Sequence, residues 1–421
     1  MQNFVYWASI ICFAVAFCIA AFKCLQWLGI LPYQKEITVL PNSREKIYWQ
    51  EIVKLLLFVI LTRVFIFFAF ILVDGIAKDA PLFVARTPDN YLTRWDASHY
   101  INLAKGGYQT EGDAQNWIVF YPMYPLLIKL FSFVFVNYEV SAYIVSYVTL
   151  GFACVYLYKL VLLDYDADTA FRSVKYMLIY PWAFFLGAPF TEGPFICFTV
   201  IAIYAVRKHK WLWAGIFGAF ASFTRTQGLL LLVPGVLEWC RHMREQGALE
   251  QKFIKFDWRG IGIFITVLGM GAYLLVNYAV WGDPLRFLYY QRTHWYQEFG
   301  FFAKNLHMHM GSVINGGAQD VISLWLPQVL LFFVSAGVIA AMSFCKGMRM
   351  SYVAYAIVYL FISYSPTWLL SAPRYMLSAF PLFIAMAIFT KHKLADQLMT
   401  VAFSMLLVIY ILAFHIGHLV M

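Results

Sequence analysis

Charged side chains are scarce in this chain. Asp, Glu, Lys and Arg make up only 13% of its 421 residues, whereas 62% are hydrophobic and the mean hydropathy is +0.69. Soluble globular domains carry roughly 25% charged residues, so this composition excludes a water-soluble enzyme. Several apolar runs reach the ~20 residues that a helix needs to cross a bilayer. We therefore expect an all-α, multi-pass integral membrane protein, with residues 1–421 forming a single transmembrane domain.

Paired cysteines and nucleotide-binding motifs are also missing. The seven cysteines lie in or beside apolar runs without CxxC spacing, so neither a disulfide framework nor a zinc site is predicted. The chain has no P-loop, no glycine-rich dinucleotide fingerprint and no HExxH motif, which removes support for an ATP or nucleotide-sugar site. A divalent metal would need a ligand set that the sequence does not offer. We therefore predict no cofactor; a divalent metal has no support in the sequence and stays only as an alternative role for two acids, Asp96 and Glu192.

The excess of basic residues, a net charge of +9, lies in short clusters between apolar runs. Clusters in short loops mark the cytoplasmic side of a membrane protein, so they indicate topology and argue against a nucleic-acid partner. This pattern places the N-terminus outside. It then brings the following polar segments to one non-cytoplasmic side: Asp96, Glu192, Arg225, the loop 281–320 and Arg374.

The apolar runs predict about twelve transmembrane helices. Those between residues 175 and 240 are short, which indicates broken or half-length helices. We expect an extra N-terminal helix and cytoplasmic loop over 1–50, a core over 51–390 and a C-terminal helix in 391–421. The predicted spans are 3–22, 52–73, 140–163, 175–189, 193–206, 211–224, 228–240, 260–281, 321–344, 351–369, 376–390 and 398–418.

Residues 121–137 are apolar but short, and they contain two prolines and Lys129. As a further span they would move Glu192 to the opposite side of the membrane from Asp96. We therefore predict an amphipathic helix lying in the membrane interface.

Asp96 stands in the segment Arg94–Tyr100, within a polar and aromatic loop that follows the second predicted span. Apolar residues at helical spacing after it, ended by two glycines, predict a short helix on which Asp96 and His99 share a face. A carboxylate at a membrane surface suits a general base. Capping of the short helix is the alternative role.

Three further charged residues interrupt apolar sequence. Glu192 lies in a turn bounded by proline and glycine, where it can position an acceptor, bind a metal with Asp96 or begin a helix. Arg225 and Arg374 are candidates for binding an anionic phosphate, and the alternative for Arg225 is an ion pair with a nearby acid. The aromatic loop that begins at Gly282 is expected either to help form an acceptor site or to join an interfacial belt.

In order, these motifs resemble the PIG-V family, which comprises GPI mannosyltransferase 2 and its bacterial relatives within the GT-C superfamily. The resemblance spans about residues 50–390 and includes the motifs Arg94-Trp95-Asp96, Phe120-Tyr121-Pro122, Pro189–Glu192, Arg225–Gly228, Gly282-Asp283-Pro284 and Arg374-Tyr375.

This resemblance implies a membrane glycosyltransferase that moves a hexose, by expectation mannose, from a polyprenyl-phosphate sugar to a glycolipid, glycan or protein hydroxyl with inversion. Asp96 matches the acid of the first outer loop and becomes the expected base. Glu192 matches the acid of the second outer loop and is a second catalytic candidate. Substrate contacts are expected from Arg94, Trp95, His99, Tyr100 and Tyr121.

Two other classes are compatible with charged residues among membrane helices. A transporter or flippase of lipid-linked sugars would show paired internal repeats, which the sequence lacks. A non-catalytic scaffold subunit would not need the acids Asp96 and Glu192. We expect a bacterial plasma membrane rather than the endoplasmic reticulum.

Overall fold

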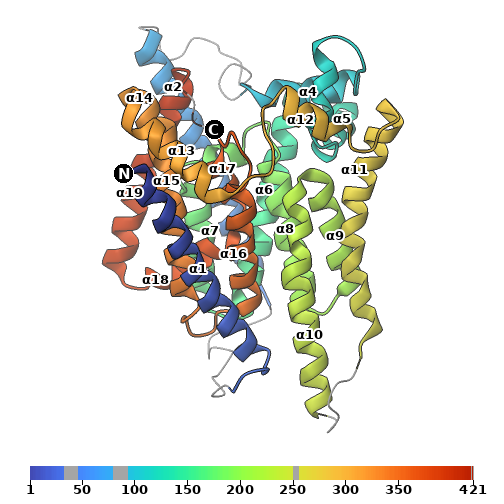
Figure 1. Ribbon diagram of the computed structural model, residues 1–421, viewed down its shortest axis with the longest axis vertical. Coiled ribbons are helices and arrows are strands. Elements are labelled where there is room, and N and C mark those ends of the chain that lie inside the picture. Colours follow the sequence, from blue (N-terminus) through green and yellow to red (C-terminus); the bar gives the residue numbers. More distant parts are fainter. Residues whose placement is uncertain (33–45, 79–92, 250–255, 419, 421) are drawn as a thin grey trace.

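A computed structural model describes residues 1–32, 46–78, 93–249, 256–418 and 420. Every regular element in these ranges is a helix, and the helices form an elongated bundle (Figure 1). The predicted all-α class is therefore confirmed. Part of the predicted first outer loop, residues 79–92, lies outside the described residues.

Six of the described helical segments are long and apolar enough to cross a membrane, which supports an integral, multi-pass membrane protein. They are α1 (Gln2–Trp27), α2 (Trp49–Lys78), α6 (Tyr138–Leu162), η4 with α11 (Trp258–Ile265 and Thr266–Trp281), α14 with η5 and α15 (Ala318–Asp320, Val321–Trp325 and Leu326–Met342), and α19 (Lys393–His415).

Five of the other six predicted spans correspond to shorter helices. A helix of 14 residues, such as α9, is ~21 Å long, against ~30 Å for a hydrocarbon core. Three of the four short helices expected between residues 175 and 240 are therefore present. These shorter helices are α8 (Glu192–Arg207), α9 (Trp211–Thr224), α10 (Leu232–Leu249), α16 (Met350–Tyr364) and α18 (Phe380–Phe389).

The predicted span 175–189 is wrong. Helix α7 runs from Ala167 to Ile179 instead, so it begins in a segment that was expected to be a loop. Asp166 fixes its start, because the carboxylate accepts a hydrogen bond from the Thr169 amide at 2.7 Å. Pro181 follows closely and prevents the helix from continuing. The chain then passes through the short helix η2 (Ala183–Leu186) to α8.

Helix α8 occupies the centre of the bundle. Nearly all of its residues are buried, and it packs against α6 on one side and α9 on the other. A helix that is apolar around its whole circumference belongs inside a protein, which explains its composition. Its first residue, Glu192, is thereby held inside the bundle near the end that carries α4 and α12.

The upper end of the bundle in Figure 1 carries short helices that lie across it. These are α4 (Asp96–Gly106), η1 (Asp113–Val119), α5 (Met123–Phe135) and α12 (Arg286–Thr293). Helix α5 meets η1 at 109° and has only 13 residues, so it is too short to span by itself. Phe133 and Val134 are 78% and 73% exposed on it, which leaves an apolar face for lipid. Its position in the membrane interface stays a prediction.

The basic clusters gather at the other end. There, Arg207 pairs with Asp164, and Arg349 pairs with Glu238 of α10. Lys175 of α7 contacts Asp396 at the start of α19 at 2.6 Å. The additional helix α1 packs against α13 (Phe302–Asn315), α15 and α16, so it is joined to the rest of the bundle.

Candidate active site

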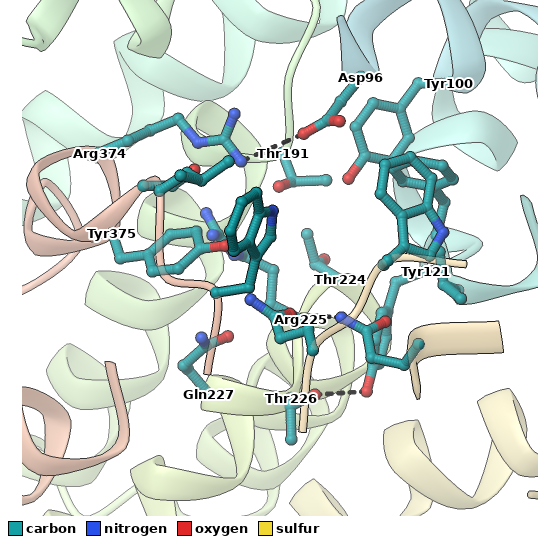
Figure 2. Close-up of a pocket in the computed structure, with 18 of the residues that line it drawn as sticks. Asp96, Tyr100, Tyr121, Thr191, Thr224, Arg225, Thr226, Gln227, Arg374 and Tyr375 are labelled. Carbon is teal, nitrogen blue, oxygen red and sulfur yellow. Dashed lines mark hydrogen bonds and ion pairs between the residues drawn. The ribbon is translucent and has the colours of Figure 1, made fainter. Parts of the chain in front are cut away.

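A cavity of about 340 Å³ is lined in part by residues of the short helices α4 and α12. It brings together residues from six separate parts of the chain (Figure 2). The lining residues are Asp96, Tyr100, Val119, Phe120, Tyr121, Thr191, Thr224, Arg225, Thr226, Gln227, Gln291, His294, Trp295, Tyr296, Gln297, Trp368, Leu370, Ser371, Arg374 and Tyr375.

Asp96 is the first residue of α4, and its carboxylate reaches this cavity. It does not cap the helix through a side-chain hydrogen bond; instead, Arg374 donates from Nη2 to Oδ2 at 3.2 Å. The other oxygen, Oδ1, makes no hydrogen bond to the described residues. The side chain is 19% exposed, so water or a ligand can reach it. The capping alternative is therefore not the arrangement that the structure shows.

The Asp96 carboxylate belongs to a quartet of charged side chains. The other three members, Glu192, Arg225 and Arg374, are buried. Arg225 donates from Nη1 to Glu192 Oε1 at 2.8 Å, and the Nε of Arg374 lies 3.1 Å from the same oxygen. The Glu192 side chain is 1% exposed, and Glu192 does not line the cavity. Two acids and two guanidinium groups leave the quartet with no net charge. Both arginines keep unused N–H groups, including the buried Nη1 of Arg374.

The charge of Arg374 is secured by its neighbours. Burial alone would lower the pKa of its guanidinium, but Glu192 and Asp96 outweigh that effect and raise the pKa above its ordinary value. The guanidinium also lies over the rings of Phe185, Phe190 and Tyr375. A cation held in this way is available to bind an anion.

Arg225 reaches the cavity because helix α9 stops at the residue before it. The chain becomes extended at Arg225 and turns back as the 3₁₀-helix η3 (Thr226–Leu231). This return brings Gly228 so close to α9 that a Cβ atom there would lie 2.2 Å from the Ser222 amide nitrogen. Only glycine fits such a backbone approach.

We predict that Gly228→Ala displaces the Arg225 turn and destabilises the protein. Overpacking of this kind costs ~1–3 kcal/mol or more, and here the obstructing atoms are backbone. Gly271→Ala in α11 is the matched control, because a Cβ there meets nothing within 4 Å. Thermal unfolding of the purified variants in detergent should show a lowered melting temperature for Gly228→Ala alone. Equal melting temperatures would contradict the account of this turn.

Two aromatic residues that were predicted as substrate contacts line the cavity. Tyr100 lies on α4 one turn after Asp96 and borders the same space (Figure 2). The hydroxyl of Tyr121 lies 2.5 Å from that of Thr226, and its ring stacks on Tyr273 at 4.0 Å. Burial raises the pKa of Tyr121 to about 12, so its hydroxyl stays protonated.

Three other predicted contacts, Arg94, Trp95 and His99, do not line this cavity. Arg94 donates to the carbonyl of Phe414 at 2.9 Å, and the Trp95 ring packs edge-on against Phe414. His99 packs between Trp117 and Phe120, where burial lowers the pKa of its imidazole against the opposing effect of Asp96. None of the three lines the cavity. Although these residues are close to Asp96 in sequence, their side chains do not point into the cavity as the Asp96 side chain does. Their contacts anchor the short helix α4 instead.

The structure adds lining residues that were not predicted individually. Helix α12 supplies Gln291 from its last turn, and the loop after it supplies His294, Trp295, Tyr296 and Gln297. The loop after α16 supplies Trp368, Leu370 and Ser371. The excess of Tyr, Trp and His after Gly282 was a usable signal for the first loop. For the second loop, the only signal was its proximity in sequence to Arg374. Within the described ranges, no three His, Cys, Asp or Glu side chains are grouped to hold a metal ion.

Residues 121–256, about a third of the chain, match the model of the dolichyl-phosphate-mannose-protein mannosyltransferase family. The match includes Tyr121, Glu192 and Arg225, and it excludes Asp96 and Arg374. Comparison with curated protein sequences gave no match. Together with the helical membrane fold, the matched segment supports a membrane glycosyltransferase of the GT-C superfamily. Within that class, it supports a transferase of the mannosyltransferase type, which uses a sugar donor, an acceptor and the membrane lipid environment.

Proposed function

We propose that this protein transfers a hexose, by expectation mannose, from a polyprenyl-phosphate sugar to an acceptor hydroxyl, with Asp96 as general base. The observation that carries the proposal is the convergence of an accessible carboxylate and two buried guanidinium groups on one cavity. A carboxylate removes a proton, and guanidinium groups hold a phosphate. These are the two chemical tasks of such a transfer.

The donor phosphate is assigned to Arg225 and Arg374. Both side chains are at most 10% exposed, and electrostatic attraction is strong where water is excluded. An incoming phosphate adds negative charge to a quartet that is neutral without it. The spare N–H groups of the two arginines are the donors that it requires. The polyprenyl tail would extend from the cavity into the lipid.

In the proposed step, the acceptor hydroxyl oxygen attacks the anomeric carbon as its proton passes to Asp96. The bond between that carbon and the phosphate oxygen breaks, and polyprenyl phosphate leaves with the bonding electrons. Its negative charge is stabilised by Arg225 and Arg374. A single displacement of this kind inverts the anomeric centre.

Glu192 has a different role in this proposal from the one expected from sequence. It does not line the cavity, and one of its oxygens contacts both arginines. We therefore assign it as a positioning residue that sets the separation and orientation of the two guanidinium groups. Direct proton transfer to or from Glu192 is not part of the mechanism.

The reaction is placed on the non-cytoplasmic side. Helices α4 and α12, which carry lining residues of the cavity, lie at one end of the bundle, and α10, which carries Arg241, extends to the opposite end (Figure 1). Short basic loops mark the cytoplasmic side, so this polarity supports an outward-facing site. The resemblance to the PIG-V family and a bacterial plasma membrane are parts of the same proposal.

The test is to incubate the purified protein with radiolabelled polyprenyl-phosphate hexoses and extracted membrane glycolipids, and to identify products by mass spectrometry. A hexosylated product with inverted configuration is expected. Counterflow of labelled lipid-linked sugar in vesicles, without any new glycosidic bond, would instead identify a flippase.

A further inference from the structure

We infer that two loops beside the cavity form a stacking platform for a saccharide, with Trp368 and Tyr296 as its aromatic faces. This inference rests on the proposed function, since it assigns the acceptor of that transfer. It makes the acceptor a glycan or glycolipid rather than a serine or threonine of a protein.

Trp368 and Tyr296 combine three unusual properties. Both line the cavity that contains Asp96, and their exposed fractions are 58% and 71%. Both have backbone φ angles in the left-handed region, +51° and +52°. Within the described residues, neither ring packs against another aromatic ring, and neither side chain makes a hydrogen bond.

The backbone conformation of these residues is unfavourable. A bulky side chain at positive φ costs energy, because Cβ crowds the neighbouring carbonyl. Strain of this kind persists only where surrounding contacts enforce it, and it is concentrated at ligand-binding sites. Core packing does not explain it here, since both rings lie largely outside the core. The contacts that enforce it lie between the two loops, and they leave both rings exposed at the cavity, where a ligand can stack on them.

The surrounding contacts brace the two loops against each other. Thr367 donates its amide to the Glu298 carbonyl at 2.7 Å, and Gly300 donates to the Ser365 carbonyl at 2.8 Å. Phe299 and Pro366 form an antiparallel bridge between these bonds. The two aromatic residues therefore flank a short, hydrogen-bonded pair of chain segments rather than two independent loops.

The buried side chain of Asn305 holds the second of these two chain segments in place. It is 1% exposed, and its Nδ2 lies within hydrogen-bond distance of three successive carbonyls, those of Tyr364, Ser365 and Pro366, at 2.8, 3.2 and 2.8 Å. A buried amide that serves three carbonyls fixes the path of the chain just before Trp368. The platform is thereby preorganised, which lowers the entropic cost of binding.

The neighbouring polar groups match a saccharide. The lining of the cavity offers the amides of Gln291 and Gln297, which also hydrogen-bond to each other, and the amide of Gln227. Uncharged amides donate to and accept from hydroxyl groups, and aromatic rings cover the apolar C–H face of a pyranose. Amide side chains together with aromatic rings therefore suit a sugar ring, which has hydroxyl groups at its rim and an apolar C–H face. An unfolded peptide segment would instead need backbone partners.

The test measures acceptor kinetics for Trp368→Ala with an alkyl mannoside as the acceptor. Loss of one stacked ring should raise the acceptor KM about tenfold and leave kcat nearly unchanged. Trp368→Phe retains a ring and should recover most of the affinity. Trp213→Ala is the matched control, because Trp213 is similarly exposed, at 54%, but lies on α9 outside the cavity.

Trp368→Gly should raise KM without lowering the melting temperature, since glycine relieves the strained φ.

Unchanged acceptor KM in Trp368→Ala would overturn the platform, and so would efficient transfer to a synthetic Ser/Thr peptide with none to the mannoside. Saturation-transfer NMR of the mannoside with the purified wild-type protein and Trp368→Ala separates this inference from the proposed function. If no donor sugar is transferred by the wild-type protein but mannoside binding still depends on Trp368, the transferase assignment fails and the platform stands. If transfer occurs and mannoside binding ignores Trp368, the reverse holds.

Discussion

Purified Asp96→Asn should lose about 10²–10⁴-fold in the rate of sugar transfer while keeping the wild-type melting temperature. Asparagine has the same shape and still offers a carbonyl oxygen to Arg374, so the contact observed at 3.2 Å can be retained. It has no basic oxygen to take the proton of the acceptor hydroxyl. The measurement is single-turnover transfer with saturating donor, so that chemistry rather than product release is observed.

The matched control for this variant is Asp113→Asn in the same outer segment. Asp113 is exposed at the start of η1 and lies outside the cavity. It should transfer sugar at the wild-type rate. If Asp96→Asn is equally active, the carboxylate is not the base and the mechanism fails, even though the cavity itself would be unaffected.

Glu192→Ala is expected to have the largest effect on stability. The substitution leaves Arg225 and Arg374 buried without their shared partner, and removing one member of a buried ion pair costs about 3–5 kcal/mol. We expect a large drop in the melting temperature measured in detergent, together with poor expression. Glu192→Gln should be less severe, because the amide oxygen can still accept from one of the two guanidinium groups.

Glu111→Ala provides the comparison, because it also deletes a carboxylate but from an exposed position in the first outer segment. Its melting temperature should match that of the wild type. A Glu192→Ala protein as stable as Glu111→Ala would show that the arginines find other partners. In that case Glu192 would no longer be needed to explain their positions.

Much of the helical architecture could be predicted because apolar runs and their interruptions determine where helices begin and end. The span 211–224 coincides with α9, which starts after a basic loop and ends at Arg225. The charge pattern also grouped Asp96, Arg225 and Arg374 on one side, and the cavity brings all three together. The failure at 175–189 has a local cause: hydropathy alone gave too little weight to Asp166 as a helix cap.

Details of the site depend on tertiary contacts that a single sequence does not encode locally. Asp96 and Arg374 meet although they are 278 positions apart. The direction of Arg94 is set by a carbonyl on α19, which no motif around Asp96 reveals. The positive φ angles at Tyr296 and Trp368 arise from pairing between two distant loops. Neither residue type would suggest that conformation.

Arg374 donates a hydrogen bond to Asp96, yet the proposed donor phosphate needs the same guanidinium. A phosphate that enters first would share this cation, so that Arg374 would hold the Asp96 carboxylate less tightly when the acceptor arrives. An acceptor that enters first would meet a base still held by its counter-ion. The enzyme is therefore expected to follow a compulsory sequence of addition, donor before acceptor, and this sequence would limit wasteful activation of hydroxyl groups while no sugar is available. Initial-rate measurements with both substrates varied, and a dead-end analogue of each, would reveal it.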